Sequence, residues 1–294
     1  MINPNKIVIG TRGSALALVQ SNWVAAFLRG AYPGILIEIV EVVTQGDRSQ
    51  ATDTPLSSYG EKGIFAKELE EALLSGRIDL AVHSMKDLAA VLPNGLHIAA
   101  VPEREDARDA VIGVRLADLP AGGIIGTGSV RRQSLIRSLY PHLCVRQIRG
   151  NVGTRIRKLR DGSYDSIILA LSGMKRLGLT HEIVEILDSN QFVPDPGQGA
   201  LAIETRIADS RTNELAAILN HHESYLCTAA ERAYLSALSA GCQTPIGAYC
   251  TLNGDTLTIR VFRADDNQLS RVILEGVASD PVALGIRAAE LVQY

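Results

Sequence analysis

Short apolar segments typical of buried β-strands alternate with helical segments in this chain, and this alternation constrains the fold more than any other feature. In the N-terminal part, the predicted strands cover residues 6–10, 35–43 and 78–82. Apolar residues at three-to-four-residue spacing predict helices between them, at residues 16–27 and 65–74. This order predicts an α/β fold with parallel strands, in which ligands bind beyond the carboxyl ends of the strands. The turns at residues 11–14 and 83–87 fall at such ends.

The same alternation recurs in the middle of the chain and predicts a second α/β domain. Its predicted strands cover residues 124–125, 144–148 and 166–171, and its predicted helices begin at residues 131 and 153. A rigid turn at residues 194–199 then returns the chain to the first domain, where residues 200–204 supply a further strand.

The pattern changes after residue 220 and predicts a small α+β domain. A helix at 224–238 is followed by two β-like runs, 257–261 and 271–277, that could pair, and by a closing helix at 282–291. The sequence therefore predicts domain 1 at residues 1–99 with 200–218, domain 2 at residues 100–199 and domain 3 at residues 219–294.

Composition and charge argue against several classes of protein. The net charge is −3 and aromatic residues make up only 4% of the chain, which disfavours a protein that binds nucleic acid. No apolar run approaches the roughly 18 residues that cross a bilayer. The first six residues lack the pattern of a signal peptide. We therefore expect a cytoplasmic enzyme or binding protein with no nucleic-acid or membrane partner.

Arginines gather in two glycine-rich segments of this acidic chain, residues 126–133 and 146–155. A local cationic site suits one particular anion, because the planar guanidinium binds a carboxylate or phosphate at two points. Neighbouring glycines let backbone N–H groups approach the same anion. We expect this role for Arg131, Arg132, Arg149 and Arg155, and an exposed helix face for Arg157, Lys158 and Arg160.

A carboxylate and a thiol stand at positions where they could react. Asp87 follows a predicted buried strand beside Lys86, which would aim its carboxylate into a cleft. The alternative is that Asp87 or Ser84 only caps a helix. Cys242 lies on a predicted loop between Gly241 and a Thr-Pro-Ile-Gly turn. Its thiol is either a nucleophile or attachment point, or an incidental surface cysteine.

The remaining cysteines do not suggest a metal site. Cys144 and Cys227 lie in apolar or helical segments and are predicted to be small core residues. The chain has no Cys-x-x-Cys pair and no histidines at ligand spacing, so we expect no metal. Arg12, Ser14 and Lys62 add positive charge and hydrogen-bond donors to the first domain. Together these features suit a small molecule with several carboxylates or phosphates.

Seven segments give the chain a specific resemblance to a known family. They are similar, in order and over nearly the whole length, to motifs of the porphobilinogen deaminases, also called hydroxymethylbilane synthases. The segments are residues 11–18, 62–70, 82–87, 126–133, 149–155, 197–200 and 241–247.

The resemblance implies a fold and a reaction. It implies two α/β domains like those of periplasmic binding proteins, with the active site between them, and a small α+β C-terminal domain. It implies a monomeric transferase of tetrapyrrole and haem biosynthesis that joins porphobilinogen molecules head to tail and releases ammonia. The growing chain would be built on a dipyrromethane cofactor, held by a thioether to Cys242.

The resemblance also assigns residues to roles. Asp87 is implied as the catalytic residue, which holds pyrrole N–H groups and stabilises positive charge as ammonia leaves. The residues implied for cofactor binding are Cys242, Lys86, Ser84, Ser129, Arg131, Arg132 and Arg155. Those implied for substrate binding are Arg12, Ser14, Lys62, Phe65, Arg149, Arg176 and Gln198.

The chain departs from the family pattern at several positions. These are Leu88-Ala89-Ala90 after the aspartate, Gly128 in the arginine turn, Asp195 before the Gly-Gln-Gly turn, and Gln45 where arginine is common. They bear on rate and affinity more than on the type of reaction, because Asp87, the arginines and Cys242 are retained. The rival hypothesis is a two-lobed protein that closes on an anion without chemistry, which would need neither Asp87 nor Cys242.

Overall fold

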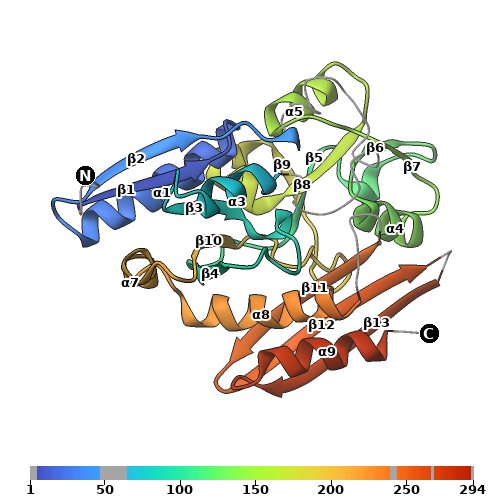
Figure 1. Ribbon diagram of the computed structural model, residues 1–294. Coiled ribbons are helices and arrows are strands. Elements are labelled where there is room, and N and C mark those ends of the chain that lie inside the picture. The colour runs from blue at the N-terminus through green and yellow to red at the C-terminus, as the bar shows by residue number, and fades with distance from the viewer. Residues whose placement is uncertain (1–4, 47–64, 239–243, 266–267, 293–294) are drawn as a thin grey trace. The chain divides into compact units, whose positions relative to one another are not determined.

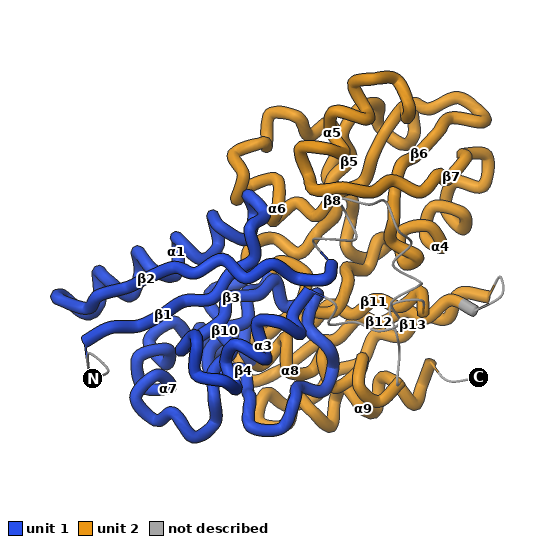
Figure 2. Tube along the Cα trace, turned by 45° about the horizontal axis from the view of Figure 1, so that its top comes forward, with its two compact units in different colours: residues 1–104, 200–225 blue, residues 105–199, 226–294 orange. Residues whose placement is uncertain are grey.

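The chain folds into two compact units. The structure is a computed structural model that describes residues 5–46, 65–238, 244–265 and 268–292 (Figure 1). One unit comprises residues 1–104 with 200–225, and the other comprises residues 105–199 with 226–294 (Figure 2). This division keeps the C-terminal residues with the middle of the chain, and the three domain boundaries expected from the sequence stay a prediction.

The first unit is built on a five-stranded sheet with the order β2-β1-β3-β10-β4. Its strands are β1 Lys6–Thr11, β2 Leu36–Glu41, β3 Leu80–Ser84, β4 Leu96–Ala100 and β10 Leu201–Arg206. β1 pairs in parallel with β2 and β3, whereas β10 runs antiparallel to β3 and β4. The expected α/β class and the returning strand after residue 200 are therefore confirmed.

Helices cover both faces of this sheet. They are α1 Ala15–Ala31, α3 Lys67–Leu74 and α7 Ser210–Ala217. Successive strand residues point to opposite faces. Leu80 accordingly packs with Val24 and Leu28 of α1, while the next residue, Ala81, packs with Leu69 of α3. Burial on both faces explains why these strands read as continuous apolar runs.

The second unit contains a similar sheet with the order β7-β6-β8-β5-β9. Its strands are β5 Asp109–Gly113, β6 Ile124–Gly126, β7 Cys144–Arg146, β8 Ser166–Ala170 and β9 Ile183–Ile186. The helices beside it are α4 Val130–Leu139, α5 Val152–Arg160 and α6 Leu171–Arg176. β6 is parallel to both neighbours, and β5 is antiparallel to both of its own.

A three-stranded antiparallel sheet completes the second unit, in the order β11-β12-β13. Its elements are β11 Ile246–Asn253, β12 Thr256–Asp265 and β13 Gln268–Val277, with helices α8 His222–Ala237 and α9 Pro281–Leu291. The expected pairing of the two β-like runs is confirmed, since Thr258 stands opposite Glu275. The helices approach closely at Gly285, where a Cβ would lie 2.2 Å from the Ala230 oxygen.

One prediction about the cysteines is wrong. Cys144 is exposed rather than part of a core, because its strand β7 lies at the edge of the sheet. Cys227 is buried in α8, as expected, and Cys250 is buried in β11.

Candidate active site

Asp87 closes a single 3₁₀ turn, Met85–Asp87, directly after strand β3. The turn is anchored by two backbone bonds, from the Met85 N–H to the Ala200 oxygen at 3.0 Å and from the Leu88 N–H to the Met85 oxygen at 3.1 Å. The Asp87 side chain is partly exposed, and no hydrogen bond or ion pair to its carboxylate occurs within the described residues. Its oxygens are therefore available to donors of a ligand.

The capping alternative finds no support at this turn. Ser84 precedes the turn but makes no side-chain cap. Its hydroxyl instead lies 3.0 Å from Nε2 of Gln20 on helix α1, which donates to it.

Three further predicted site residues of the first unit lie around the start of α1. Ser14 is the N-cap of this helix, and its Oγ accepts a hydrogen bond from the Ala17 N–H at 3.3 Å. The Arg12 guanidinium lies over the ring of Phe65, 4.1 Å from the centroid, in cation–π geometry. The structure thus brings Arg12 and Phe65 together. Lys62 and Cys242 lie outside the described residues.

In the second unit, Arg131 and Arg132 both turn inward to Asp109. Each places its Nη2 2.8 Å from a different carboxylate oxygen. Their Nη1 atoms donate to the Val193 and Ile168 oxygens, each at 2.9 Å. All three ionic side chains are buried. Burial alone would raise the pKa of Asp109, but the two guanidinium groups outweigh it and hold that pKa well below its ordinary value.

This arrangement leaves an excess of positive charge. Two cations share one carboxylate, and the Nε–H groups of Arg131 and Arg132 have no acceptor within the described residues. Asp109 was not identified from the sequence. The sequence feature that could have indicated it is a carboxylate at the start of an apolar segment, in a chain that also contains two consecutive arginines. The anion expected beside these arginines is thus supplied partly by the protein itself.

Gln198 joins the same cluster. Its Nε2 donates to the Ala107 oxygen at 2.6 Å and to Oδ1 of Asp109 at 2.7 Å. The turn that carries it requires glycine, because Gly199 has φ +90° and a Cβ there would lie 2.2 Å from the Glu105 oxygen. The bonds fix this turn to the Asp109 cluster, and a substrate-binding role for Gln198 stays a prediction.

The other predicted residues of the second unit lie at helix ends and turns. Ser129 caps α4, with its Oγ accepting from the Arg132 N–H at 3.4 Å. Arg155 donates to the Gly150 oxygen at 2.7 Å. Arg176 donates to the Gly199 oxygen at 2.7 Å, and burial lowers its pKa. Arg149 is half-buried. Their ligand-binding roles stay predictions.

The arginines expected on an exposed helix face lie on α5. Arg157 and Arg160 are exposed there, as predicted, and Lys158 is half-buried with its Nζ 3.3 Å from the Arg149 oxygen.

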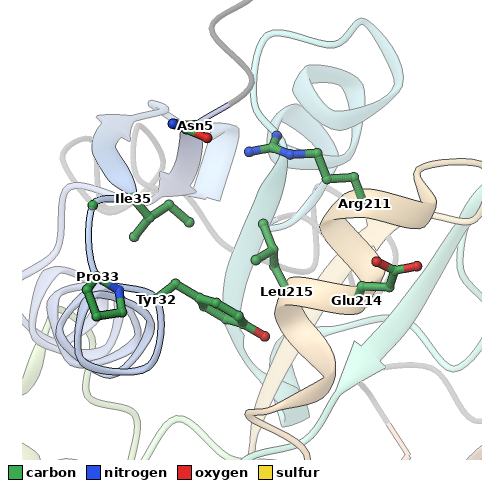
Figure 3. Close-up of a pocket in the computed structure, with 8 residues that line it drawn as sticks. Asn5, Tyr32, Pro33, Ile35, Arg211, Glu214 and Leu215 are labelled. Atoms are coloured by element: carbon green, nitrogen blue, oxygen red, sulfur yellow. The ribbon is translucent and has the colours of Figure 1, made fainter.

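A cavity of about 400 Å³ lies elsewhere in the first unit (Figure 3). Tyr32 and Ile35 line one side of it, and Arg211, Glu214 and Leu215 line the other. Ile35 precedes β2, so the cavity is at the amino ends of the parallel strands. Ligands of such sheets bind at the opposite ends, and none of the predicted site residues lines this cavity.

The described residues give no sign of a metal centre or a membrane span. They contain no group of three or more His, Cys, Asp or Glu residues that could hold an ion. None of the helices in this part of the chain is long and apolar enough to cross a membrane.

Two family models together match nearly the whole chain. The model described as "Porphobilinogen deaminase, dipyromethane cofactor binding domain" matches residues 7–214. The model described as "Porphobilinogen deaminase, C-terminal domain" matches residues 225–293. These matches agree with the resemblance found in the motifs.

Solved structures similar to the chain include solute-binding proteins. A methionine-binding protein, MetQ, is 13% identical with a TM-score of 0.48, over 76% of this chain and 91% of that one. The VFT2 domain of BvgS from Bordetella pertussis is 14% identical with a TM-score of 0.42, over 72% and 85%. A TRAP periplasmic solute-binding protein from Desulfovibrio salexigens is 10% identical with a TM-score of 0.44, over 73% and 72%.

Proposed function

Because the chain belongs to the porphobilinogen deaminase family of transferases, we propose that it forms hydroxymethylbilane from four porphobilinogen molecules. The molecules are joined head to tail, and each loses ammonia. The matched domain is the one that binds a dipyrromethane cofactor in this family. In our proposal a thioether to Cys242 holds this cofactor.

The observation that carries the proposal is the excess positive charge around Asp109. Each pyrrole of the substrate and of the cofactor bears an acetate and a propionate group, so a chain of pyrroles is a polyanion. One positive charge and two buried Nε–H donors remain at Arg131 and Arg132 after Asp109 is counted. Guanidinium groups form charge-assisted hydrogen bonds with carboxylates. The excess positive charge of this arginine pair therefore supports a cofactor-binding role for it.

Asp87 is the proposed catalytic residue. When bound, the dipyrromethane supplies the pyrrole carbon to which the first substrate unit is joined. The partly exposed carboxylate of Asp87, at the end of an anchored turn, accepts hydrogen bonds from pyrrole N–H groups. A fixed negative charge there stabilises the cation that develops on a substrate pyrrole as ammonia leaves.

The remaining predicted residues would hold the side chains of the pyrroles. We propose Lys86, Ser84, Ser129 and Arg155 for the cofactor, and Arg12, Ser14, Lys62, Phe65, Arg149, Arg176 and Gln198 for the substrate. We further propose that the protein acts in the cytoplasm as a monomer, whose molar mass light scattering would measure.

The intact mass of the purified protein, before and after incubation with porphobilinogen, tests the proposal. We expect a mass excess equal to two linked pyrrole units in the wild type and none in Cys242→Ser. Cys144→Ser is the matched control, because its exposed thiol lies on an edge strand and should not affect the excess. A bare polypeptide mass after incubation, with no hydroxymethylbilane formed, would favour the anion-binding alternative.

Asp87→Asn tests the role of the carboxylate. The amide keeps the size of the side chain but removes its charge, so turnover should fall by about 10²–10³-fold or more while the cofactor mass is retained. Asp118→Asn, at an exposed position of the second unit, should leave turnover unchanged. Equal turnover in Asp87→Asn and the wild type would remove Asp87 from the mechanism.

A further inference from the structure

Three ionisable side chains lie in the apolar layer between helix α3 and the sheet of the first unit. They are Glu70 of α3, His83 of β3 and Glu204 of β10, which expose only 8%, 5% and 0% of their surface. Nε2 of His83 lies 3.0 Å from Oε2 of Glu204. Buried charges of this kind are costly unless they compensate one another. Nothing in the proposed reaction uses them.

The strand register shows why these groups meet. His83 stands opposite Ala202, so Glu204, two residues further along β10, lies on the same face of the sheet. The residue before each of them, Val82 before His83 and Ile203 before Glu204, belongs to the core on the α1 face. The cluster is therefore confined to the α3 face, among apolar side chains.

The charges of the cluster do not balance when both carboxylates are ionised. His83 contacts only one of the two carboxylates, Glu204, so the second carboxylate, Glu70, is buried near a negative charge without a cation of its own. Burial, and then the charge of Glu204, raises the pKa of Glu70 to about 7, with His83 acting in the opposite direction and Glu71 adding a smaller increase. Glu70 thus binds a proton in a pH range where an exposed glutamate does not.

The other charged groups near α3 are engaged elsewhere. Arg206 of β10 donates to the Leu73 and Ile78 oxygens at 2.7 Å. His97 of β4 contacts Asn213, and Lys6 of β1 pairs with Glu38. Within α3 itself, Lys67 and Glu71 are exposed, and Glu68 accepts from the Gln45 N–H. The remaining cluster consists of Glu70, His83 and Glu204.

The cluster adjoins the Asp87 turn along strand β3. His83 is the penultimate residue of β3, and the 3₁₀ turn begins two residues later. The Met85 N–H continues the pairing of β3 with the β10 segment by donating to the Ala200 oxygen. The same two strands therefore hold both the cluster and the base of the turn. A second negative charge in the cluster would push α3, β3 and β10 apart at this point.

We propose that Glu70, His83 and Glu204 are positioning residues: a neutral Glu70 beside the buried His83–Glu204 pair keeps the Asp87 turn in its working geometry, and a charged Glu70 loosens it. The consequence for turnover rests on the proposed function. The loosening of the turn rests on the burial of the three side chains and on the pairing of β3 with β10.

Glu70→Gln tests the loosening without reference to activity. Glutamine mimics the protonated carboxyl and cannot ionise. At pH 6, hydrogen exchange of the peptide that spans residues 84–90 should be equal in the variant and the wild type. At pH 8 the wild-type peptide should exchange several-fold faster than that of the variant at the same pH. Glu71→Gln, one residue along on the exposed side of α3, is the matched control and should exchange like the wild type.

The pH dependence of Tm gives a second measurement. Because the pKa of Glu70 is raised on folding, the folded state holds a proton that the unfolded state releases from about pH 4.3 upward. The stabilisation is complete below this range and is lost as the pH rises through about 7. The Tm of Glu70→Gln relative to the wild type should therefore increase between pH 5 and pH 8. Glu70→Met provides the same comparison if the glutamine variant does not fold.

Measurements of turnover distinguish a failure of this proposal from a failure of the proposed function. The ratio of kcat in Glu70→Gln to kcat in the wild type should rise from pH 6 to pH 8, with KM little changed. Identical exchange, identical Tm profiles and a constant kcat ratio would overturn the positioning role. A wild type that forms no hydroxymethylbilane, but still shows the exchange and Tm differences, would overturn the proposed function and support the cluster.

Discussion

The two units each bury an ionic cluster, but the clusters have opposite composition. In the second unit two arginines share Asp109, and their rigid guanidinium forks reach carbonyl oxygens on two neighbouring segments. In the first unit two glutamates and one histidine are buried together, and His83 lies 3.0 Å from Glu204. Arginine remains charged at any physiological pH, whereas burial raises the pKa of Glu70 to about 7. The charges of the Asp109 cluster are therefore constant at physiological pH, whereas the charge of the cluster that contains Glu70 changes with pH.

Removing the shared carboxylate of the second unit should have the largest effect. Asp109→Ala leaves two buried guanidinium groups without their counter-ion, and we expect the free energy of unfolding to fall by about 3–5 kcal/mol. Urea unfolding measures this loss. The control is Asp106→Ala, which breaks a pair with the more exposed Arg108 and should cost about 0–1 kcal/mol. Equal losses in the two variants would show that the Asp109 cluster is not the stronger of the two ion pairs.

Gln198→Leu should have an intermediate effect. The variant removes the donors to the Ala107 oxygen and to Asp109, and it leaves these buried acceptors with fewer partners. We expect a loss of about 1–3 kcal/mol in the free energy of unfolding. Gln191→Leu, at an exposed position before this turn, is the control. If both variants unfold at the same urea concentration, the turn does not depend on this hydrogen bonding.

The smallest expected effect is that of pH on the contribution of Asp109 to the Tm. The depressed pKa of Asp109 means that its stabilisation is present above the unfolded value, about 3.9, and is lost only as the pH falls through the folded value. The Tm difference between Asp109→Asn and the wild type should therefore be constant from pH 5 to pH 8. If this Tm difference changes between pH 5 and pH 8, the Asp109 cluster also responds to pH, and the two clusters do not differ in this respect.

The sequence predicted the alternation of strands and helices well because apolar periodicity reports burial directly. The strands around β1, β6 and β8 are examples. Strands β4, β5, β9 and β11 were not identified. Of these, β4, β5 and β9 are short, and each takes its place in a sheet through antiparallel pairing with residues distant in sequence. Local patterns carry no information about such pairing.

The sequence indicated which side chains belong to the candidate site better than it indicated which of them contact one another. The arginine pair was predicted to bind an anion, but the buried Asp109 that it contacts lies on a strand 22 residues earlier in the sequence. His83 and Glu204 stand 3.0 Å apart, yet 121 residues separate them along the chain. A single sequence shows which side chains could pair, and only the fold shows which ones do.

The position of β10 in the first sheet has a consequence for how the protein is made. β10 lies between β3 and β4, but it is encoded after the whole segment 105–199 of the second unit. A nascent chain that has just released β4 from the ribosome therefore lacks the central partner of both strands. The first sheet can close only after all five strands of the second α/β sheet have been synthesised, and its exposed strand edges must be kept from other chains until then.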